Sequence, residues 1–280
     1  GSDYEIFGNY DSSYLFGEVG RSSDCTSAET ITNIGLLNVG SVTNMYAMFN
    51  NTGYNAMTKL DLGDNFDTSN VTNMNSMFWR TGTMAMTSLD LGTKFDTSNV
   101  KYMSHMFYFT GQEKMTDLNL KDKFNTSNVI DMSAMFSHTG FRVMTTLNFG
   151  HNFDTSKVTS MSYMFYNTGY TAMTSLDLGS KFNTSAVTDM QHMFFSTGFK
   201  AMKNLNLGTQ FDTNKVTNMS HMFTAMGYMA MTSFDLGEKF DTSSVTDMNS
   251  MFYQTGRNVM TELNLGDKFD TSNVTDMRDM

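Results

Sequence analysis

The sequence predicts a repeat solenoid of the leucine-rich-repeat kind, with one short parallel strand and one short helix or 3-10 segment per 29-residue turn. Three series of apolar residues predict this fold, because each recurs every 29 residues without insertion or deletion. Such a period is typical of solenoids, whose units bury their apolar faces only against their neighbours. The series are Met45, Met74, Met103, Met132, Met161, Met190, Met219, Met248 and Met277; Phe49, Phe78, Phe107, Phe136, Phe165, Phe194, Phe223 and Phe252; and Phe66, Phe95, Phe124, Phe153, Phe182, Phe211, Phe240 and Phe269.

The strand of each unit is expected where leucines alternate with polar residues. In one repeat, residues 86–92 follow the pattern L-x-x-L-x-L that forms the strand of leucine-rich repeats. Side chains alternate along a strand, so Leu89 and Leu91 should point inward while Ser88 and Asp90 point outward. Strands of adjacent turns should then pair in parallel.

The helix or 3-10 segment is expected after a cluster of capping residues. Residues 96–99 are of helix-capping types, and the apolar residues that follow lie three, three and one positions apart. This spacing favours one face of a short helix, which Thr110 and Gly111 should end. The apolar stripe consists of Val100, Met103, Met106 and Phe107.

The repeat pattern also predicts the organisation of the chain. Residues 1–30 lack the pattern and are expected to form an N-terminal cap, followed by a shortened first repeat over 31–57 and regular 29-residue repeats over 58–280. The chain opens with Gly1 and Ser2, which are typical of a cloning scar, and stops within a repeat. We therefore expect a fragment, truncated at its C-terminal end, whose targeting and anchoring signals lie outside it.

Composition argues against several classes of partner. A net charge of −10 disfavours nucleic acid and anionic membranes, which bind basic patches. No apolar stretch approaches the roughly 18 residues of a membrane span, so we expect no membrane insertion. The single cysteine, Cys25, rules out an internal disulfide framework and is interpreted as a small buried cap residue. The chain is expected to be monomeric.

A recurring phrase carries a family resemblance. Phe-Asp-Thr-Ser-Asn-Val-Thr-Asp-Met-x-x-Met-Phe, followed by Met-Thr-Ser-Leu-Asp-Leu, resembles the BspA-like leucine-rich repeats of bacterial surface proteins. Residues 66–78, 95–107 and 240–252 carry the match, although the unit here is longer than the common unit of that family. The resemblance implies a secreted or wall-attached protein at the bacterial cell surface, concerned with adhesion to host proteins or matrix.

Two variable columns of residues are the candidate binding surface. One follows each Met-Phe pair and the other follows the conserved glycine of each repeat, and both are rich in aromatics, the usual anchors of protein interfaces. The rings either cover the core by stacking on each other or form a ridge for a host protein or glycan, with Trp79 as the preferred anchor. The candidates are Trp79, Tyr108, Tyr166, Phe195 and Tyr253 in the first column, and Tyr54, Phe141, Tyr170, Phe199 and Tyr228 in the second.

A ladder of acidic and amide residues on the outward face of the sheet is the second choice. We interpret it as mainly structural, with asparagines relieving like-charge repulsion and bonding from turn to turn. Its members are Asp61, Asp90, Asn119, Asn148, Asp177, Asn206 and Asp235.

Neither catalysis nor metal or cofactor binding is expected. An active site needs a distinct nucleophile, base and orienting group, and the polar residues here recur at equivalent positions. His105, His192 and His221 share a column, with His192 and His221 one strand spacing apart, but without convergent carboxylates they favour an exposed pair over zinc. His138 and His151 lie outside that column and carry no signal.

Two functions remain. The first is a cell-surface adhesin-type binding module that engages a host protein, either matrix or immune receptor, through a repeat-built surface. The alternative is a passive rigid stalk that holds another domain away from the cell wall. The aromatic columns favour the first, and the close similarity of the repeats favours the second.

Overall fold

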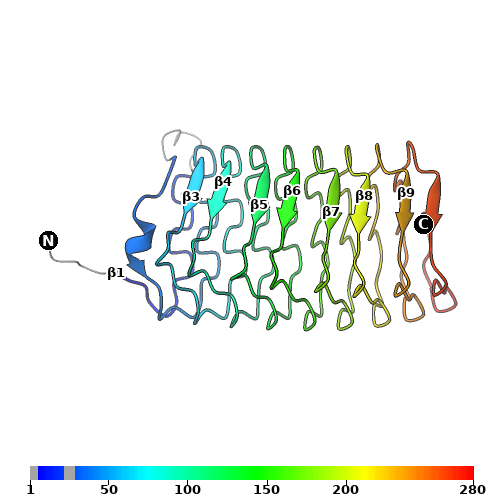
Figure 1. Ribbon diagram of the computed structural model, residues 1–280, viewed down its shortest axis with the longest axis horizontal. Coiled ribbons are helices and arrows are strands. Elements are labelled where there is room, and N and C mark those ends of the chain that lie inside the picture. The colour runs from blue at the N-terminus through cyan, green and yellow to red at the C-terminus, as the bar shows by residue number, and fades with distance from the viewer. Residues whose placement is uncertain (1–5, 22–28) are drawn as a thin grey trace.

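The chain forms a parallel β-solenoid whose coils stand side by side along the long axis of the molecule (Figure 1). The computed structural model describes residues 6–21 and 29–280. Parallel bridges link each coil to the next at one corner, from Asp11–Asn44 at the N-terminal end to Asp247–Asp276 at the C-terminal end. Beyond Asn44 the bridged residues are 29 apart, which confirms the predicted solenoid and its period.

Each coil contributes one short strand, and the strands line one side of the solenoid. The central residue of the strand, such as Leu60, points into the core, while its two neighbours are exposed in most strands. The strands are β1 (Ile6–Phe7), β2 (Leu37–Asn38), β3 (Lys59–Asp61), β4 (Ser88–Asp90), β5 (Asp117–Asn119), β6 (Thr146–Asn148), β7 (Ser175–Asp177), β8 (Asn204–Asn206), β9 (Ser233–Asp235) and β10 (Glu262–Asn264).

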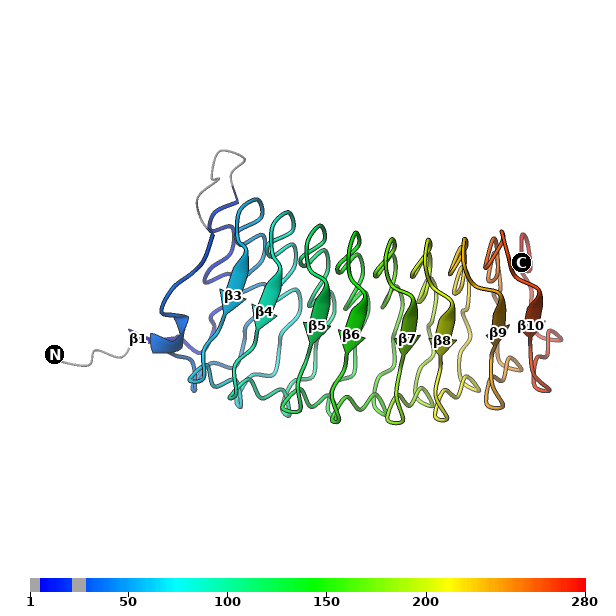
Figure 2. The same ribbon diagram turned by 45° about the horizontal axis from the view of Figure 1, so that its top comes forward.

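The strands associate two by two rather than in one continuous sheet. Parallel ladders join β3 to β4, β5 to β6, β7 to β8 and β9 to β10, and Figure 2 shows the arrows in these pairs. Within a pair, backbone bonds continue past the strand, as from the Leu62 N–H to the Asp90 carbonyl at 2.9 Å. With the ladder between β1 and β2, the strand side is therefore a row of five two-stranded ladders in the described residues.

The helix or 3-10 segment predicted in every turn is wrong. In its place lies a run of overlapping β-turns, which we call the turn run (residues 103–114 in one coil). The Met106 N–H donates to the Met103 carbonyl at 3.2 Å, as in a β-turn, but the His105 N–H donates to Ser133 of the next coil at 2.8 Å. The only 3-10 helix in the described residues is η1 (Ile34–Leu36).

Backbone conformation explains why a helix cannot form there. His105 and Phe109 have φ of 57° and 58°, and the equivalent residues of the other coils are also left-handed. A right-handed helix excludes such residues, whereas a type II turn requires one at its third position. Overlapping turns place apolar side chains inward at spacings of three and one, so the stripe read as a helix face belongs to the turn run.

The described part of the predicted cap follows the same path. The Tyr14 and Glu18 N–H groups donate to carbonyls of the next coil at 3.0 and 2.7 Å. Both residues are left-handed, as are their counterparts Ala47 and Asn51. Residues 6–21 therefore form a coil of the solenoid. Cys25 lies outside the described residues.

Side-chain ladders run through the core. Phe49, Phe78 and Phe107 are fully buried and stack nearly parallel, with ring centroids 5.5 Å apart from one coil to the next. Buried threonine hydroxyls also bond between coils, as where Thr110 Oγ1 donates to the Phe78 carbonyl at 2.7 Å. A buried polar group is costly unless bonded, so these hydroxyls hold adjacent coils in one register.

One prediction concerns the glycine that follows each strand. Gly92 and Gly179 have φ of 73° and 79°, but a Cβ on Gly92 would lie 2.0 Å from the Gly63 carbonyl oxygen, whereas a Cβ on Gly179 would meet nothing within 4 Å. Lys121 occupies this column with φ of 60°. Both substitutions to alanine incur the left-handed cost, and only Gly92→Ala adds a clash, which should remove about 1–3 kcal/mol more.

Thermal and urea unfolding of Gly92→Ala, Gly179→Ala and wild type check this expectation. Equal destabilisation by the two variants would show that coils do not approach each other as closely at Gly92 as the structure indicates.

Candidate binding face

Aromatic and imidazole rings gather on the turn-run side of the solenoid. Ring contacts connect side chains from consecutive coils, and we call this surface the aromatic face. Its members are Trp79, His105, Tyr108, Phe109, His138, Phe141, Tyr163, Tyr166, Tyr170, His192, Phe195, Phe199, His221 and Tyr228. Apart from Phe109 and His138, all come from the two aromatic columns or from the histidine column, to which Tyr163 belongs.

The turn run positions these side chains. The His105 and Phe109 N–H groups donate to Ser133 and Ser137 of the next coil at 2.8 and 3.0 Å, and every regular coil repeats the arrangement. Left-handed conformations of residues other than glycine are strained by roughly 1–3 kcal/mol each and persist only where the surroundings impose them. Here the bonds between coils impose them, so each ring stands one coil spacing from the next.

The second predicted column forms one continuous stack. Phe141, Tyr170, Phe199 and Tyr228 have centroids 4.6, 4.7 and 4.6 Å apart, with interplanar angles of 11°, 4° and 12°. All four rings are half-buried. Arg142 lies 5.4 Å from the Phe141 ring, within the range of a cation–π contact. Stacking thus covers the core edge while leaving a ring surface in solvent.

The first predicted column stacks in two sections. Trp79 meets Tyr108 edge-on at 5.3 Å, and Tyr166 stacks on Phe195 at 4.8 Å. Between the sections stands Ser137, whose small side chain breaks the column. Histidine rings pack against both sections. The Trp79 ring stacks on His105 at 5.6 Å, and the Phe195 ring stacks on His192 at the same distance.

The spacing expected of the histidine column is confirmed, but the expected exposure is wrong, because His192 and His221 are both half-buried. His192 and His221 stack at 4.5 Å, one coil apart, and Tyr163 stacks on His192 at the same distance. Burial, and then the neighbouring His221, lower the pKa of His192 from 6.5 to about 4. In the described residues, no three His, Cys, Asp or Glu side chains converge as metal ligands would.

Two of the predicted residues make no ring contact with the aromatic face, and one member of the face was not predicted from the sequence. For the predicted Tyr54 and Tyr253, the described residues show no ring contact with the face, and Tyr253 is 46% exposed. His138, to which the sequence assigned no role, contacts four rings: Phe109 at 4.1 Å, Tyr166 at 5.3 Å, and those of Tyr108 and Phe141. His138 lies one residue after the first predicted column. The residue type at this next position also varies from coil to coil, and that variation is the only sequence signal that could have identified His138.

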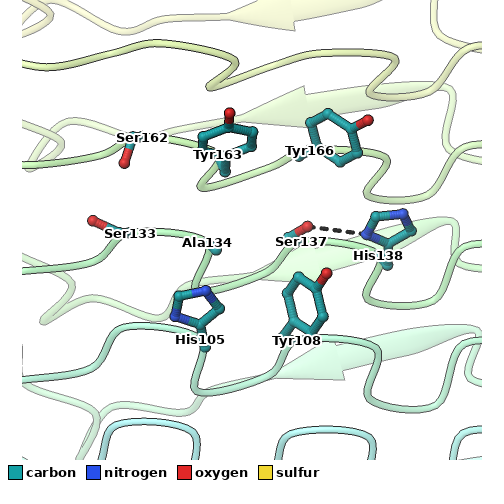
Figure 3. A pocket seen from close by; sticks show the side chains of 9 residues that line it. All are labelled: His105, Tyr108, Ser133, Ala134, Ser137, His138, Ser162, Tyr163 and Tyr166. Atoms are coloured by element: carbon teal, nitrogen blue, oxygen red, sulfur yellow. Dashed lines mark hydrogen bonds between the residues drawn. The ribbon is translucent and has the colours of Figure 1, made fainter.

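The break in the columns opens a cavity of about 550 Å³ (Figure 3). In the coil that crosses it, both the histidine column and the first predicted column hold small residues, Ala134 and Ser137, each at most 5% exposed. These form the floor, and rings from the two adjacent coils form the walls. The cavity is lined by His105, Tyr108, Ser133, Ala134, Ser137, His138, Ser162, Tyr163 and Tyr166.

One end of the cavity is a neutral imidazole network. Asn167 Nδ2 lies 3.0 Å from His138 Nε2, and Ser137 Oγ lies 3.0 Å from His138 Nδ1. With Asn167 Nδ2 as the donor to Nε2, that nitrogen is unprotonated, and Nδ1 carries the proton and donates to Ser137. Burial, with a contribution from Arg80, lowers the pKa of His138 to about 4, in agreement with a neutral ring.

This tautomer is not that of a general base acting on serine. With Nδ1 protonated, Ser137 Oγ is an acceptor and keeps its own proton, whereas nucleophilic serine needs an imidazole nitrogen that takes the proton away. Ser137 is also 1% exposed. The pair is therefore arranged to offer hydrogen bonds rather than to activate a nucleophile.

The opposite end of the cavity is a chain of serine hydroxyls. Ser133 Oγ lies 2.9 Å from Ser160 Oγ, which lies 3.3 Å from Ser162 Oγ. Ser160 stands in a corner column where other coils mostly have Asp or Asn, and Ser133 Oγ donates to one of these, Asp131, at 2.6 Å. Both ends of the cavity are therefore polar, while its walls are rings.

The second-choice residues on the strand side serve the backbone. In each coil, Oδ1 of the Asp or Asn accepts the N–H two residues on, as from Gly92 to Asp90 at 3.0 Å, which is an Asx turn. Lys121 Nζ also lies 2.6 Å from Asp90 Oδ1 and lowers the pKa of that carboxyl. The same turn occurs at Asp61, Asn119, Asn148, Asp177, Asn206 and Asp235.

Fold and face together define a class: a β-solenoid of 29-residue coils that displays a ladder of partly exposed rings on its turn side. The chain belongs to the family described as Mycoplasma protein of unknown function, DUF285, which matches residues 21–142, 108–226, 139–255 and 195–280. This match supports the expected repeat family, while the finer BspA-like resemblance stays a prediction. No curated protein and no solved structure matches the chain. Over residues 6–21 and 29–280, no helix is long and apolar enough to cross a membrane.

A pH dependence follows from His138. Its pKa is lowered from 6.5 to about 4 in the folded chain, so between these values the unfolded chain binds more protons. Stability should therefore fall as pH drops from 6.5 towards 4. In His138→Asn, which introduces the residue found at Asn51 and Asn167 of this column, the loss between pH 7.5 and 5 should shrink by on the order of 1 kcal/mol.

Urea unfolding at the two pH values measures the difference, and NMR titration of the His138 imidazole measures its cause. A His138 that titrates near 6.5 in the folded chain would contradict the neutral network.

Proposed function

We propose that this chain is an adhesin-type binding module at a bacterial cell surface, and that it engages a host protein, either matrix or immune receptor, through the aromatic face. The observation that carries the proposal is a ladder of half-buried rings that continues over consecutive coils. The extracellular location rests on the BspA-like resemblance.

The chemistry of the face supports this proposal. Tyrosine and tryptophan combine a large apolar area with a polar tip, and they dominate the energetic centres of protein interfaces. Trp79, Tyr108 and Tyr166 are all partly exposed. Arg80 lies 5.3 Å from the Phe109 ring at the border of the face, and arginine is also enriched at such centres.

Rigidity supports it as well. Binding is weakened by the entropy lost when side chains and loops become ordered. Here the stacking of Tyr170 on Phe141 and Phe199, and the backbone bonds between coils, already hold the rings in place. A partner would meet a preorganised surface.

A rigid stalk is the second candidate, and a different observation favours it. The corner bridges run without interruption from Asp11 to Asp276, so the coils resist bending apart at that corner. A stalk needs this property and has no need of exposed rings.

Surface binding to a panel of matrix proteins and immune-receptor ectodomains tests the proposal. The double variant Trp79→Ala/Tyr108→Ala should bind a partner at least about 10-fold more weakly, because truncating interface anchors typically costs more than 1 kcal/mol each. Tyr10→Ala is the control, since Tyr10 is 69% exposed and lies in the first coil, outside the face.

Circular dichroism must show that both variants fold. Silence of the wild type across the panel, or equal weakening by the control, would favour the stalk.

A further inference from the structure

We propose that the cavity above Ala134 and Ser137 binds one uncharged sugar ring, such as a terminal hexose of a glycan. This inference rests on the proposed binding function and names the chemistry of one ligand group. The observation behind it is an empty position in an otherwise filled ladder, with ring walls and polar ends.

The empty position lies between His105 and Tyr163, two coils apart. In the next coils this column is continuous, since Tyr163, His192 and His221 stack at 4.5 Å steps. At Ala134 the side chain is a methyl group and leaves the place of one ring open. His138 enters the cavity only at one end, between Tyr108 and Tyr166.

The width of this opening suits one ring. Two coil spacings amount to roughly 9.6 Å between the planes of the walls. The flat His192 ring fills the same interval between Tyr163 and His221, with centroids 4.5 Å from each, so the width admits one flat ring as well as one sugar ring. A pyranose chair with its axial hydrogens is thicker, and it presents C–H groups to both walls.

The ends of the cavity match the rim of such a ring. A sugar has apolar faces and hydroxyls around its edge, and here the polar groups stand at the edges: Ser133 and Ser162 at one end, Ser137 and His138 at the other. The Ser137 hydroxyl, which accepts from His138 Nδ1, keeps its own proton to donate to a sugar hydroxyl, and the edge of a phenylalanine ring offers no acceptor for it.

The absence of charge in the cavity lining narrows the class of sugar that it can bind. No carboxylate, ammonium or guanidinium lines the cavity, and the imidazole of His138 is neutral. An anionic sugar would find no cation there to compensate its lost hydration. Neutral hexoses and N-acetylhexosamines fit this lining.

Calorimetry and saturation-transfer NMR with methyl glycosides of glucose, galactose, mannose, N-acetylglucosamine and N-acetylgalactosamine test the inference on the whole chain. At least one should bind with a Kd of roughly millimolar order, as expected for a single small ring. The variant Ala134→His fills the opening with the residue that occupies this column at His105, His192 and His221. It should weaken binding at least about 10-fold.

Ser250→His is the matched control, because Ser250 belongs to the same column, has φ of 52°, and lies outside the cavity. It should leave glycoside binding unchanged. No binding of any glycoside, or equal binding by Ala134→His, overturns the inference. So does binding of N-acetyl-tyrosinamide in place of glycosides, which would make the cavity a site for an aromatic side chain.

The two proposals fail separately. A host protein that binds the face but tolerates both Ala134→His and enzymatic removal of its glycans refutes the sugar site and leaves the binding module. A glycoside that binds the cavity while no host protein binds the face leaves the sugar site and refutes the protein partner.

Discussion

The structure depends on one constraint, the fixed register of backbone hydrogen bonds between successive coils. Along the turn run, alternate N–H groups donate to the next coil, as from Ala47 to Asn75 at 2.9 Å. These bonds fix the coil spacing and hold left-handed residues in a conformation they would otherwise avoid. Because the register never slips, equal positions become ladders, whether of core phenylalanines, buried threonines or surface rings. The aromatic face is thus a product of the backbone.

Much of the fold could be predicted from the sequence, because the period alone places Leu60 and Phe49 in a shared core. The sequence could not distinguish a short helix from overlapping β-turns, because apolar residues at spacings of three and one are compatible with both. A helix and a run of overlapping turns differ in the positive φ of residues such as His105 and Phe109. Neither histidine nor phenylalanine is a residue type that indicates a positive φ. Glycine would have been a clear signal, but histidine and phenylalanine adopt this conformation here only because neighbouring coils impose it.

The candidate site was predictable in part for the same reason. Columns of aromatics are visible in the sequence, so Tyr170 and Phe199 could be expected to lie side by side. His138 escaped because it stands one residue after the first column, and a ring that reaches across to Tyr166 is a property of side-chain packing. The cavity exists because Ala134 and Ser137 have small side chains where neighbouring coils have rings. Small residues in a variable column draw attention only once the rings on both sides are known.

The strand side and the turn side differ in continuity: ladders on the strand side join coils in pairs, whereas the turn run links every coil. The coils are otherwise interchangeable, and the opening at Ala134 is tied to a single coil and its two neighbours. A duplication or loss of whole 29-residue units elsewhere in the gene would lengthen or shorten the molecule while leaving those walls intact. Reach and recognition can therefore evolve independently, the first by copy number and the second by substitutions within one coil.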